Sequence, residues 1–301
     1  MAVYFAQRTL DAINASLEKD QGAAYRQRLE QVIPHIGDAY RGEEKVPFRA
    51  HLGASGLGKD CARAIWYGWR WYTRPHFEGR MIRLFNRGHL EEARFIALLL
   101  SIGVQIYQQD ENGKQFRIHH AGGHVGGSGD GIGVGLPDLP SGMPALLEFK
   151  THGEKSFLKL QKEGVRSAKF EHYVQMNLYM RKMNLTVALY GAVNKNTDEL
   201  WLEIVQLDTI IADQYLDRGT QIVKSVHPPK KINESPGWFE CKFCDHKGVC
   251  HLGKEPEHNC RTCHFGRPDP DGVWRCYVKP TEPRELNQEQ QFAGCKDYLK
   301  L

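Results

Sequence analysis

The sequence has no apolar run that is long enough to cross a membrane. Its longest run, Phe95–Val104, is interrupted by a serine and a glycine and falls far short of the roughly 20 apolar residues of a spanning helix. The first segment, Met1–Lys19, mixes charged with apolar residues and lacks the uninterrupted apolar core of a signal peptide. We therefore expect no membrane segment and a cytoplasmic location, in a bacterial cell or in a virus-infected host cell.

A strong net charge is also missing. The 40 Lys and Arg residues nearly balance the 36 Asp and Glu residues, which leaves a formal net charge of +4. A weakly basic chain permits an anionic partner such as nucleic acid but does not require one. The 301 residues are 41% hydrophobic and 25% charged, which is typical of a globular protein with one large domain and an appendage, or with two domains.

Cysteine is almost absent from the first 240 residues, where only Cys61 occurs, whereas seven cysteines follow residue 240. In a reducing compartment, clustered cysteines are more often metal ligands than disulfides. The distribution therefore predicts a cysteine-rich, metal-binding tail.

Hydrophobic periodicity predicts an α/β fold, in which helices interleave with a mixed sheet. Helices are expected over Ala2–Leu17, Ala23–Ile36, Ser55–Thr73, Arg80–Ile102 and Lys169–Met183, and strands over Val104–Gln109, Phe116–His120, Ala145–Lys150, Leu185–Val193 and Leu200–Gln206. We divide the chain into an N-terminal helical segment 1–45, a core 46–240 and a cysteine-rich tail 241–301.

Two carboxylates and a lysine form the most informative chemical pattern. Asp130 lies between two glycines, and Glu148 and Lys150 follow in a predicted strand. Because alternate residues of a strand point to the same face, Glu148 and Lys150 should project together. Carboxylate oxygens are ligands for Mg²⁺ or Mn²⁺, and such an ion lowers the pKa of bound water and neutralises phosphate charge. Lys150 is suited to orient or deprotonate that water and to stabilise the transition state.

Each of these short patterns is common, and a solvated charge pair on a surface hairpin is the alternative interpretation. Two flanking elements favour the chemical one. Glu92 follows Gly88 in the predicted helix before these strands. Gln175 and Tyr179 lie one helical turn apart on one face of a later helix.

The ordered set Gly88-x-x-x-Glu92, Gly129-Asp130-Gly131, Glu148-Phe-Lys150 and Gln175-x-x-x-Tyr179 resembles the PD-(D/E)xK nuclease superfamily over about residues 50 to 250. The Gln-x-x-x-Tyr element is similar to the RecB-like branch, which includes viral recombination exonucleases. The resemblance implies a restriction-endonuclease-like core, a mixed sheet flanked by helices.

The same resemblance assigns roles to single residues. It implies that Glu92 is a third acidic metal ligand and that the backbone carbonyl of Phe149 completes the coordination. Many RecB-like enzymes have a histidine at the helix position, so His89 competes with Glu92 for this role. Gln175 and Tyr179 would position Lys150 and the DNA strand.

The first cysteine group, Cys241, Cys244 and Cys250, has the spacing C-x2-C-x5-C. Alone, these three thiols suit a zinc site with His246 or His251 as the fourth ligand. In RecB-like nucleases of the AddB type and in CRISPR-adaptation nucleases, however, a distant N-terminal cysteine joins three such cysteines to hold a [4Fe–4S] cluster. That resemblance implies that Cys61 is the fourth ligand. The alternative interpretation makes Cys61 a small core residue.

The second cysteine group has the spacing C-x2-C-x12-C-x18-C and predicts a zinc ribbon-like module over residues 258–296. Its four cysteines are Cys260, Cys263, Cys276 and Cys295. His258 and His264 are alternatives for one of the thiolates. A short tail with many prolines is expected to need a metal ion to fold.

Several basic and aromatic residues are candidates for contact with nucleic acid. The basic run after the predicted active-site strand comprises Lys155, Lys159, Lys162, Arg166 and Lys169. It suits either a phosphate-backbone groove or an ordinary solvated helix face. The aromatic segment Arg63–Tyr72 suits either base stacking or a core position. We expect His124 to be structural, and for His172 a supporting role near the site stays open.

These observations predict a metal-dependent deoxyribonuclease with DNA as its partner. We expect an exonuclease acting on DNA ends or single strands in phage or bacterial replication, recombination or repair, beside a helicase or a single-strand annealing protein. One alternative is a DNA-processing endonuclease of the CRISPR-adaptation kind. The non-enzyme alternative is a metal-stabilised DNA-binding module with a vestigial site, against which the complete set Asp130, Glu148 and Lys150 argues.

Overall fold

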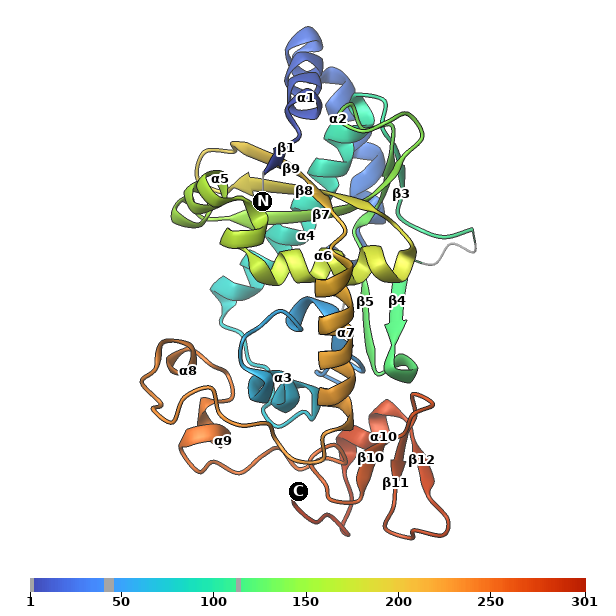
Figure 1. Ribbon diagram of the computed structural model, residues 1–301, viewed down its shortest axis with the longest axis vertical. Coiled ribbons are helices and arrows are strands. Elements are labelled where there is room, and N and C mark those ends of the chain that lie inside the picture. Colours follow the sequence, from blue (N-terminus) through green and yellow to red (C-terminus); the bar gives the residue numbers. More distant parts are fainter. Residues whose placement is uncertain (1–2, 41–45, 112–114) are drawn as a thin grey trace. The chain divides into compact units, whose positions relative to one another are not determined.

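The computed structural model describes residues 3–40, 46–111 and 115–301, and these residues form two compact units (Figure 1). The first unit contains the described residues of Met1–Gly42, Phe77–Ile118 and Ser128–Asp213. The second contains those of Glu43–His76, His119–Gly127 and Gln214–Leu301. The units interleave along the chain and so differ from the three consecutive segments predicted above. The reason is that 46–76 and 119–127 pack with the tail, partly through hydrogen bonds of Arg70 to Arg261 O and of His124 to Asp269 O.

The first unit is built on a six-stranded mixed sheet in the order β1-β9-β8-β7-β6-β3. The strands are β1 (Tyr4–Phe5), β3 (Gln105–Tyr107), β6 (Gly131–Val134), β7 (Pro144–His152), β8 (Val187–Asn194) and β9 (Leu200–Gln206). The central pair β7 and β8 is parallel, and the other neighbouring pairs are antiparallel. A parallel pair needs a crossover, which α5 (Glu154–Ala168) and α6 (Phe170–Met183) supply.

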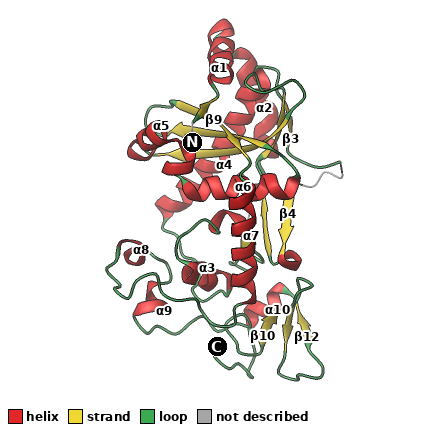
Figure 2. Ribbon diagram, in the orientation of Figure 1, coloured by secondary structure: helices red, strands yellow, loops and turns green. Residues whose placement is uncertain are grey.

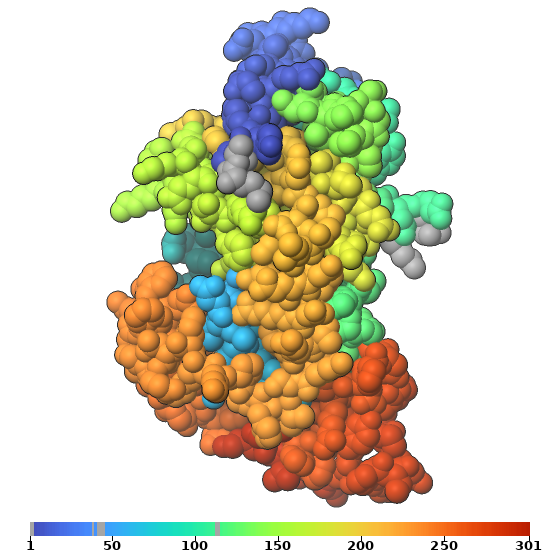
Figure 3. All heavy atoms as spheres, viewed as in Figure 1, coloured from blue at the N-terminus to red at the C-terminus, as the bar shows by residue number. Residues whose placement is uncertain are grey.

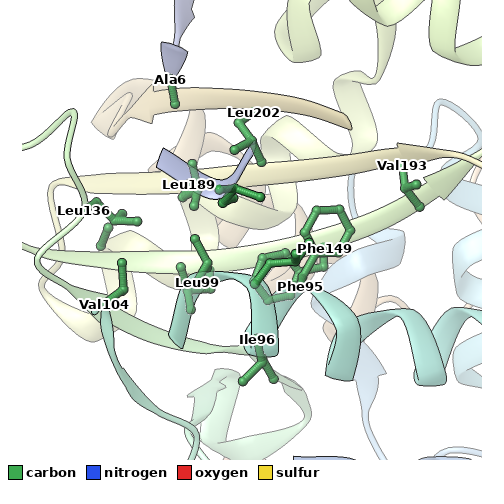
Figure 4. Packing of buried hydrophobic residues seen from close by; sticks show 14 of the residues in the cluster. Ala6, Phe95, Ile96, Leu99, Val104, Leu136, Phe149, Leu189, Val193 and Leu202 are labelled. Atoms are coloured by element: carbon green, nitrogen blue, oxygen red, sulfur yellow. The ribbon is translucent and has the colours of Figure 1, made fainter. Parts of the chain in front are cut away.

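Helices cover both faces of this sheet (Figure 2). Helix α1 (Gln7–Asp20), α2 (Ala23–Val32) and α4 (Gly79–Ser101) contribute to the main hydrophobic core on one face. Phe95 of α4 and Phe149 of β7 stack there, with ring centroids 4.8 Å apart (Figure 4). A Cβ atom at Gly191 would lie 2.9 Å from the Phe149 ring, so only glycine lets these layers approach so closely. Helices α5 and α6 pack against β7 and β8.

The second unit contains short elements. They are β2 (Leu52–Gly53), α3 (Ala62–Trp69), α8 (Phe239–Lys242), α9 (Lys247–His251), β10 (Gly266–Pro268), β11 (Trp274–Cys276), β12 (Arg284–Leu286) and α10 (Gln288–Ala293). Three elements run across a unit boundary in the sequence, namely β4 (Arg117–His120), β5 (Val125–Ser128) and α7 (Thr209–Lys224). In addition, 3-10 turns occupy Ile33–His35, Gly37–Tyr40, Ala54–Gly56 and Ala121–Gly123.

A buried arginine organises the core of the second unit. The guanidinium of Arg261 lies 3.9 Å from the ring centroid of Trp71 and 4.6 Å from those of Trp69 and Trp274. It also donates a hydrogen bond to Gln291 Oε1 at 2.8 Å. The three indole rings and the guanidinium are all buried. Arg261 therefore joins the aromatic segment to the tail by cation–π contact and hydrogen bonding.

Burial decides the interpretation of the aromatic segment. Trp66, Trp69, Arg70, Trp71 and Tyr72 are all 7% exposed or less. Side chains that are inaccessible to solvent cannot stack on the bases of a bound strand, so base stacking is the wrong interpretation for these five and a core position is correct.

The predicted α/β class and most predicted elements are confirmed. Helix α4 and strand β9 differ from their predicted ranges by no more than one residue at either end. The predicted helix Ser55–Thr73 is shortened to α3, Ala62–Trp69, because a 3-10 turn precedes it and Trp71 has a positive φ of 55°. The predicted boundary near residue 45 lies outside the described residues. No helix of the described residues combines the length and apolarity that a membrane span requires.

Candidate active site

Strand β7 carries the two central residues of the candidate site. Glu148 is completely buried, Lys150 retains 27% side-chain exposure, and the Lys150 ammonium donates a hydrogen bond to Glu148 Oε1. Phe149, between them, points to the opposite face and stacks on α4. The expectation that Glu148 and Lys150 project together is therefore confirmed, and it follows from the alternation of side chains along a strand.

Asp130 joins them from the turn before β6. The backbone N–H of Phe149 donates to Asp130 Oδ2 at 2.8 Å. Strand β6 pairs with β7 through Gly131 and Leu147, which brings the Asp130 carboxylate beside the active-site strand. The three residues predicted to act together thus lie together, although 18 positions separate Asp130 from Glu148 in the sequence.

Helix α4 places both candidates for the third metal ligand near this group. The charge of His89 lowers the pKa of Asp130, although burial and not His89 dominates that pKa. The charge of Glu92 raises the pKa of Lys150. Both side chains are half-buried. The structure therefore brings both His89 and Glu92 close to the site, so the choice between them stays a prediction.

Helix α6 approaches the same face of β7 with the Gln-x-x-x-Tyr residues. The amide of Gln175 lies close enough to Glu148 to lower the pKa of that carboxyl by hydrogen bonding. Gln175 is 6% exposed and Tyr179, one turn later, is 2% exposed. Gln175 is therefore directed at Glu148.

Burial and mutual repulsion raise the proton affinity of the carboxylates. Burial, followed by the charge of Asp130, raises the pKa of Glu148 to about 7, against the opposing effect of Lys150. Burial also raises the pKa of Asp130. For Lys150, burial alone would lower the pKa, but the charges of Glu148 and Asp130 together raise it. The ammonium is therefore held in its charged form by the two carboxylates.

One carboxylate oxygen of the candidate site is suited to bind a metal ion. Glu148 Oε2 is buried and has no hydrogen bond of normal geometry to the described residues. A buried carboxylate oxygen without a donor is destabilised unless a cation or a donor reaches it. Two carboxylates at one point are the hard oxygen donors that Mg²⁺ and Mn²⁺ prefer. Within the described part of the chain, no three His, Cys, Asp or Glu side chains are already arranged as a metal-coordination group.

A polar network beyond Lys150 was missed from the sequence. His152 Nε2 and His172 Nδ1 lie 2.8 Å and 2.9 Å from the hydroxyl of Tyr190, which is completely buried in β8. Ser156 Oγ lies 3.2 Å from His152 Nδ1. Lys150 and His152, like Glu148 and Lys150, are alternate residues of one strand and point to the same face. This pattern in the sequence could have identified His152. His172 does lie near the site, as one of the two interpretations supposed.

His124 belongs to the second unit and has a structural environment there. Its Nε2 lies 2.7 Å from the backbone oxygen of Asp269, and its ring packs edge-on against Trp69 at 5.4 Å. Burial lowers its pKa. The structural interpretation of His124 is therefore confirmed.

The predicted basic run lies mainly on α5, which is yellow-green at the surface in the space-filling view (Figure 3). Lys159 has a carboxylate partner in Glu163 at 3.7 Å, and Arg166 has one in Asp208 at 3.5 Å. Lys155 and Lys162 are exposed. These pairs neutralise part of the charge, so the run is less basic than its sequence indicates.

The first cysteine group converges with Cys61 in the second unit. Cys61, Cys241, Cys244 and Cys250 line one cavity. Cys61 precedes α3, and its sulfur accepts the backbone N–H of Ala64 at 3.4 Å. Burial and then the neighbouring Cys61 raise the pKa of Cys241. Cys61 is half-buried, so the choice between a ligand role and a core position stays a prediction.

The second cysteine group also converges. Burial, followed by the proximity of Cys295, Cys263 and Cys276, raises the pKa of Cys260 to about 11. Cys263 donates its backbone N–H to Cys260 O at 3.4 Å in a tight turn. A Cβ atom at Gly266 would lie only 1.8 Å from Cys260 O, so this turn requires glycine. The thiols of a turn, of strand β11 and of the segment after α10 thus lie near enough to Cys260 to affect its pKa.

Comparison of the sequence with known proteins does not assign the chain to a family. No known family model matches this chain, and no curated protein matches it.

Comparison with solved structures finds distant similarities in fold. The alkaline exonuclease LHK-Exo from Laribacter hongkongensis has a TM-score of 0.40 at 12% identity, over 57% of this chain and 86% of that chain. LHK-Exo in complex with dAMP gives a TM-score of 0.40 at 13% identity over 57% and 86%. The structure of SSO0001 gives 0.35 at 14% identity over 75% of this chain and 94% of that chain. Similarity at this level assigns no activity, so the function is argued from the site itself.

Proposed function

We propose that the protein is a metal-dependent deoxyribonuclease that hydrolyses phosphodiester bonds in DNA. The observation that supports this most is the fully buried carboxylate of Glu148, which is paired with Lys150, lies beside Asp130 and has an oxygen without a normal hydrogen bond. Two carboxylates and an ammonium on and beside the buried strand β7 combine cation binding with a charged donor for a phosphate oxygen.

Asp130 and Glu148 would hold the Mg²⁺ or Mn²⁺ ion, with Glu92 or His89 and the Phe149 carbonyl as further ligands. When bound, such an ion neutralises phosphate charge and lowers the pKa of a water molecule. The chain's own residues then orient the reactants. Lys150 holds its ammonium beside Glu148, where it can donate to a phosphate oxygen as negative charge develops. Gln175, whose amide lowers the pKa of Glu148, would position that carboxylate from α6.

Cleavage of labelled DNA tests this proposal. We expect the purified full chain to degrade linear DNA, labelled at either end, with Mg²⁺ or Mn²⁺ and not with EDTA, because the unpaired oxygen of Glu148 needs a cation. We propose an exonuclease, so closed circular DNA should remain intact. Cutting of the circle would favour the endonuclease alternative. No cleavage of any single- or double-stranded DNA under these conditions would contradict the proposed function.

We propose further that each cysteine group holds a metal centre. Cys61, Cys241, Cys244 and Cys250 would hold a [4Fe–4S] cluster, and their four thiols around one cavity suit that donor set. Cys260, Cys263, Cys276 and Cys295 would hold Zn²⁺, because a tight turn with two of the thiols is typical of structural zinc sites. Both centres would stabilise a tail with little regular structure.

Colour and metal content test these two assignments. Protein purified without oxygen should be brown, with a broad absorption band centred at about 400 nm from thiolate–iron charge transfer. Elemental analysis should give four iron atoms and one zinc ion per chain. A colourless protein with two zinc ions would contradict the iron–sulfur assignment and leave the nuclease proposal standing.

A further inference from the structure

The active-site face of β7 continues past Lys150 to a network of two histidines around one hydroxyl. The rings of His152 and His172 stack with centroids 5.7 Å apart, and both bond to the hydroxyl of Tyr190. This hydroxyl can donate to only one of the two rings at a time. The network therefore orients both imidazoles from β7, β8 and α6 beside the candidate site.

Both imidazoles are neutral in this environment. Burial, followed by the charges of Lys169, Lys195 and Lys150, lowers the pKa of His152 to about 4. Burial and then the charge of Lys150 lower the pKa of His172 to about 2. Tyr190 engages Nδ1 of His172, and within the described part of the chain no hydrogen bond holds Nε2 of this half-buried ring. A neutral ring with a free nitrogen can donate one N–H to an anion.

Positive charge surrounds this network from three elements. Lys150 lies on β7, Lys169 precedes α6, and Lys195 follows β8. The backbone N–H of Lys195 donates to the carbonyl of His152 at 2.8 Å, which places Lys195 at the end of β7. Arg87 of α4 donates to the carbonyl of Lys195 at 3.1 Å, so the basic group continues onto the helix that carries Glu92.

Lys195 lies close enough to Arg87 and Arg80 for these cations to repel one another, and Lys169 has Glu171 as an acidic neighbour. After burial, the charges of Arg87 and Arg80 lower the pKa of Lys195. Among the described residues, no carboxylate forms an ion pair with Lys169, Lys195, Arg80 or Arg87. Cations without an ion-pair partner, such as Lys195, Arg80 and Arg87, create a positive potential that an anionic ligand relieves.

We propose that Lys169, Lys195 and His172 form a binding subsite for the DNA phosphate next to the scissile one, and that Arg87 and Arg80 continue it as a track for following phosphates. The inference rests on the proposed nuclease function and names how that site holds its substrate. Arg80 and Arg87 lie two helical turns apart, about 10 Å along α4. Arg87 and Arg80 thus extend the basic group from Lys195 along α4, which suits an extended polyanion better than a single free phosphate.

Substitutions with matched controls test the track. Lys195→Gln and Arg87→Gln remove a charge and keep a polar side chain, whereas Lys19→Gln and Arg28→Gln make the same changes at exposed positions of α1 and α2. For the first two we expect KM for a labelled oligonucleotide to rise about tenfold, with kcat within twofold. The slope of log KM against log salt should also fall by about 0.7 for a single strand or about 0.9 for duplex DNA. The controls should match the wild type in both quantities.

The variant His172→Gln tests the contribution of the neutral donor apart from that of the cations. It should raise KM and leave the salt slope unchanged, because no charge is removed. A substrate with one uncharged methylphosphonate next to the scissile linkage should weaken wild-type binding. This substrate should have little further effect on Lys195→Gln, since two changes at one contact are not additive.

The possible failures are distinguishable. A wild-type protein that cleaves no DNA contradicts the nuclease proposal. If the wild type cleaves DNA but Lys195→Gln and Arg87→Gln have the KM and salt slope of their controls, the phosphate track is overturned and the nuclease proposal stands. Circular dichroism and melting of each variant establish that folding is intact, which is expected because Arg87 is exposed and Lys195 is only half-buried.

Discussion

Replacing Lys150 by methionine should reduce DNA cleavage by roughly 10³-fold, because the charged donor at the reacting phosphate is lost. Lys150 is the cation paired with the buried Glu148. Methionine keeps a long unbranched side chain, so loss of packing is small. Steady-state cleavage of an end-labelled strand at saturating Mg²⁺ measures the effect, and the loss should be in kcat.

Lys182→Met is the matched control, since Lys182 is exposed on α6 and contacts none of the site residues named above. It should cleave DNA like the wild type. Lys150→Arg should not restore activity, because a planar guanidinium cannot take the place of an ammonium beside Glu148. Full activity of Lys150→Met in a folded protein would contradict the assigned role and with it the proposed mechanism.

Glu148→Gln tests the metal assignment at the same site. Glutamine has nearly the same shape but carries no charge, so we expect Mg²⁺ to lose a ligand and cleavage to fall by a similar factor. Calorimetric titration with Mg²⁺ separates this effect from that of Lys150→Met. The glutamine variant should bind Mg²⁺ more weakly, whereas the methionine variant should retain binding because Asp130 and Glu148 remain. Equal Mg²⁺ affinity of Glu148→Gln and wild type would contradict the ligand role of Glu148.

Removing one thiol from each cysteine group should abolish its metal centre and unfold the segment around it. A structural zinc site contributes roughly 10 kcal/mol or more to the folding of a small domain, which is comparable to the whole stability of an ordinary domain. We expect Cys61→Ser to lose iron and keep zinc, and Cys276→Ser to lose zinc and keep iron. Each variant is thus the control for the other.

Elemental analysis and limited proteolysis measure these outcomes. Cys61→Ser should become sensitive to cleavage near α8 and α9, where its partner cysteines lie, and Cys276→Ser near β10 and β11. Loss of both metals from both variants, or loss of the same metal from both, would contradict the division into two separate groups. Unchanged metal content in both would contradict the metal centres altogether.

Patterns within one element were enough to predict part of the candidate site. The alternation of a strand places Glu148 and Lys150 on one face, and the period of a helix places Gln175 and Tyr179 on one face. These relations depend only on backbone geometry, so they hold wherever the element lies. The spacing of Cys260 and Cys263 is also local, because a tight turn brings two thiols together.

The packing of distant segments had two effects that no local pattern indicates. The aromatic segment around Trp69 has the composition of a base-stacking surface, yet Arg261 from the tail covers it. Arg166 of the basic run is paired with Asp208 from a distant segment, whereas Lys195 and Arg87, which do not stand out in the sequence, join the cations next to the site. Exposure and counter-ions depend on neighbours from distant segments.

The sequence by itself determined that Glu148 and Lys150 share a strand and that two groups of cysteines have metal-ligand spacing. Only the tertiary structure decided which elements are neighbours. It paired β6 with β7 so that Asp130 reaches Phe149, brought Cys61 to the first cysteine group, and placed Tyr190 between two histidines. The physical reason is that backbone periodicity determines direction within an element. The neighbours of an element, in contrast, follow from the packing of the whole unit, including a parallel β7–β8 pair formed across two helices.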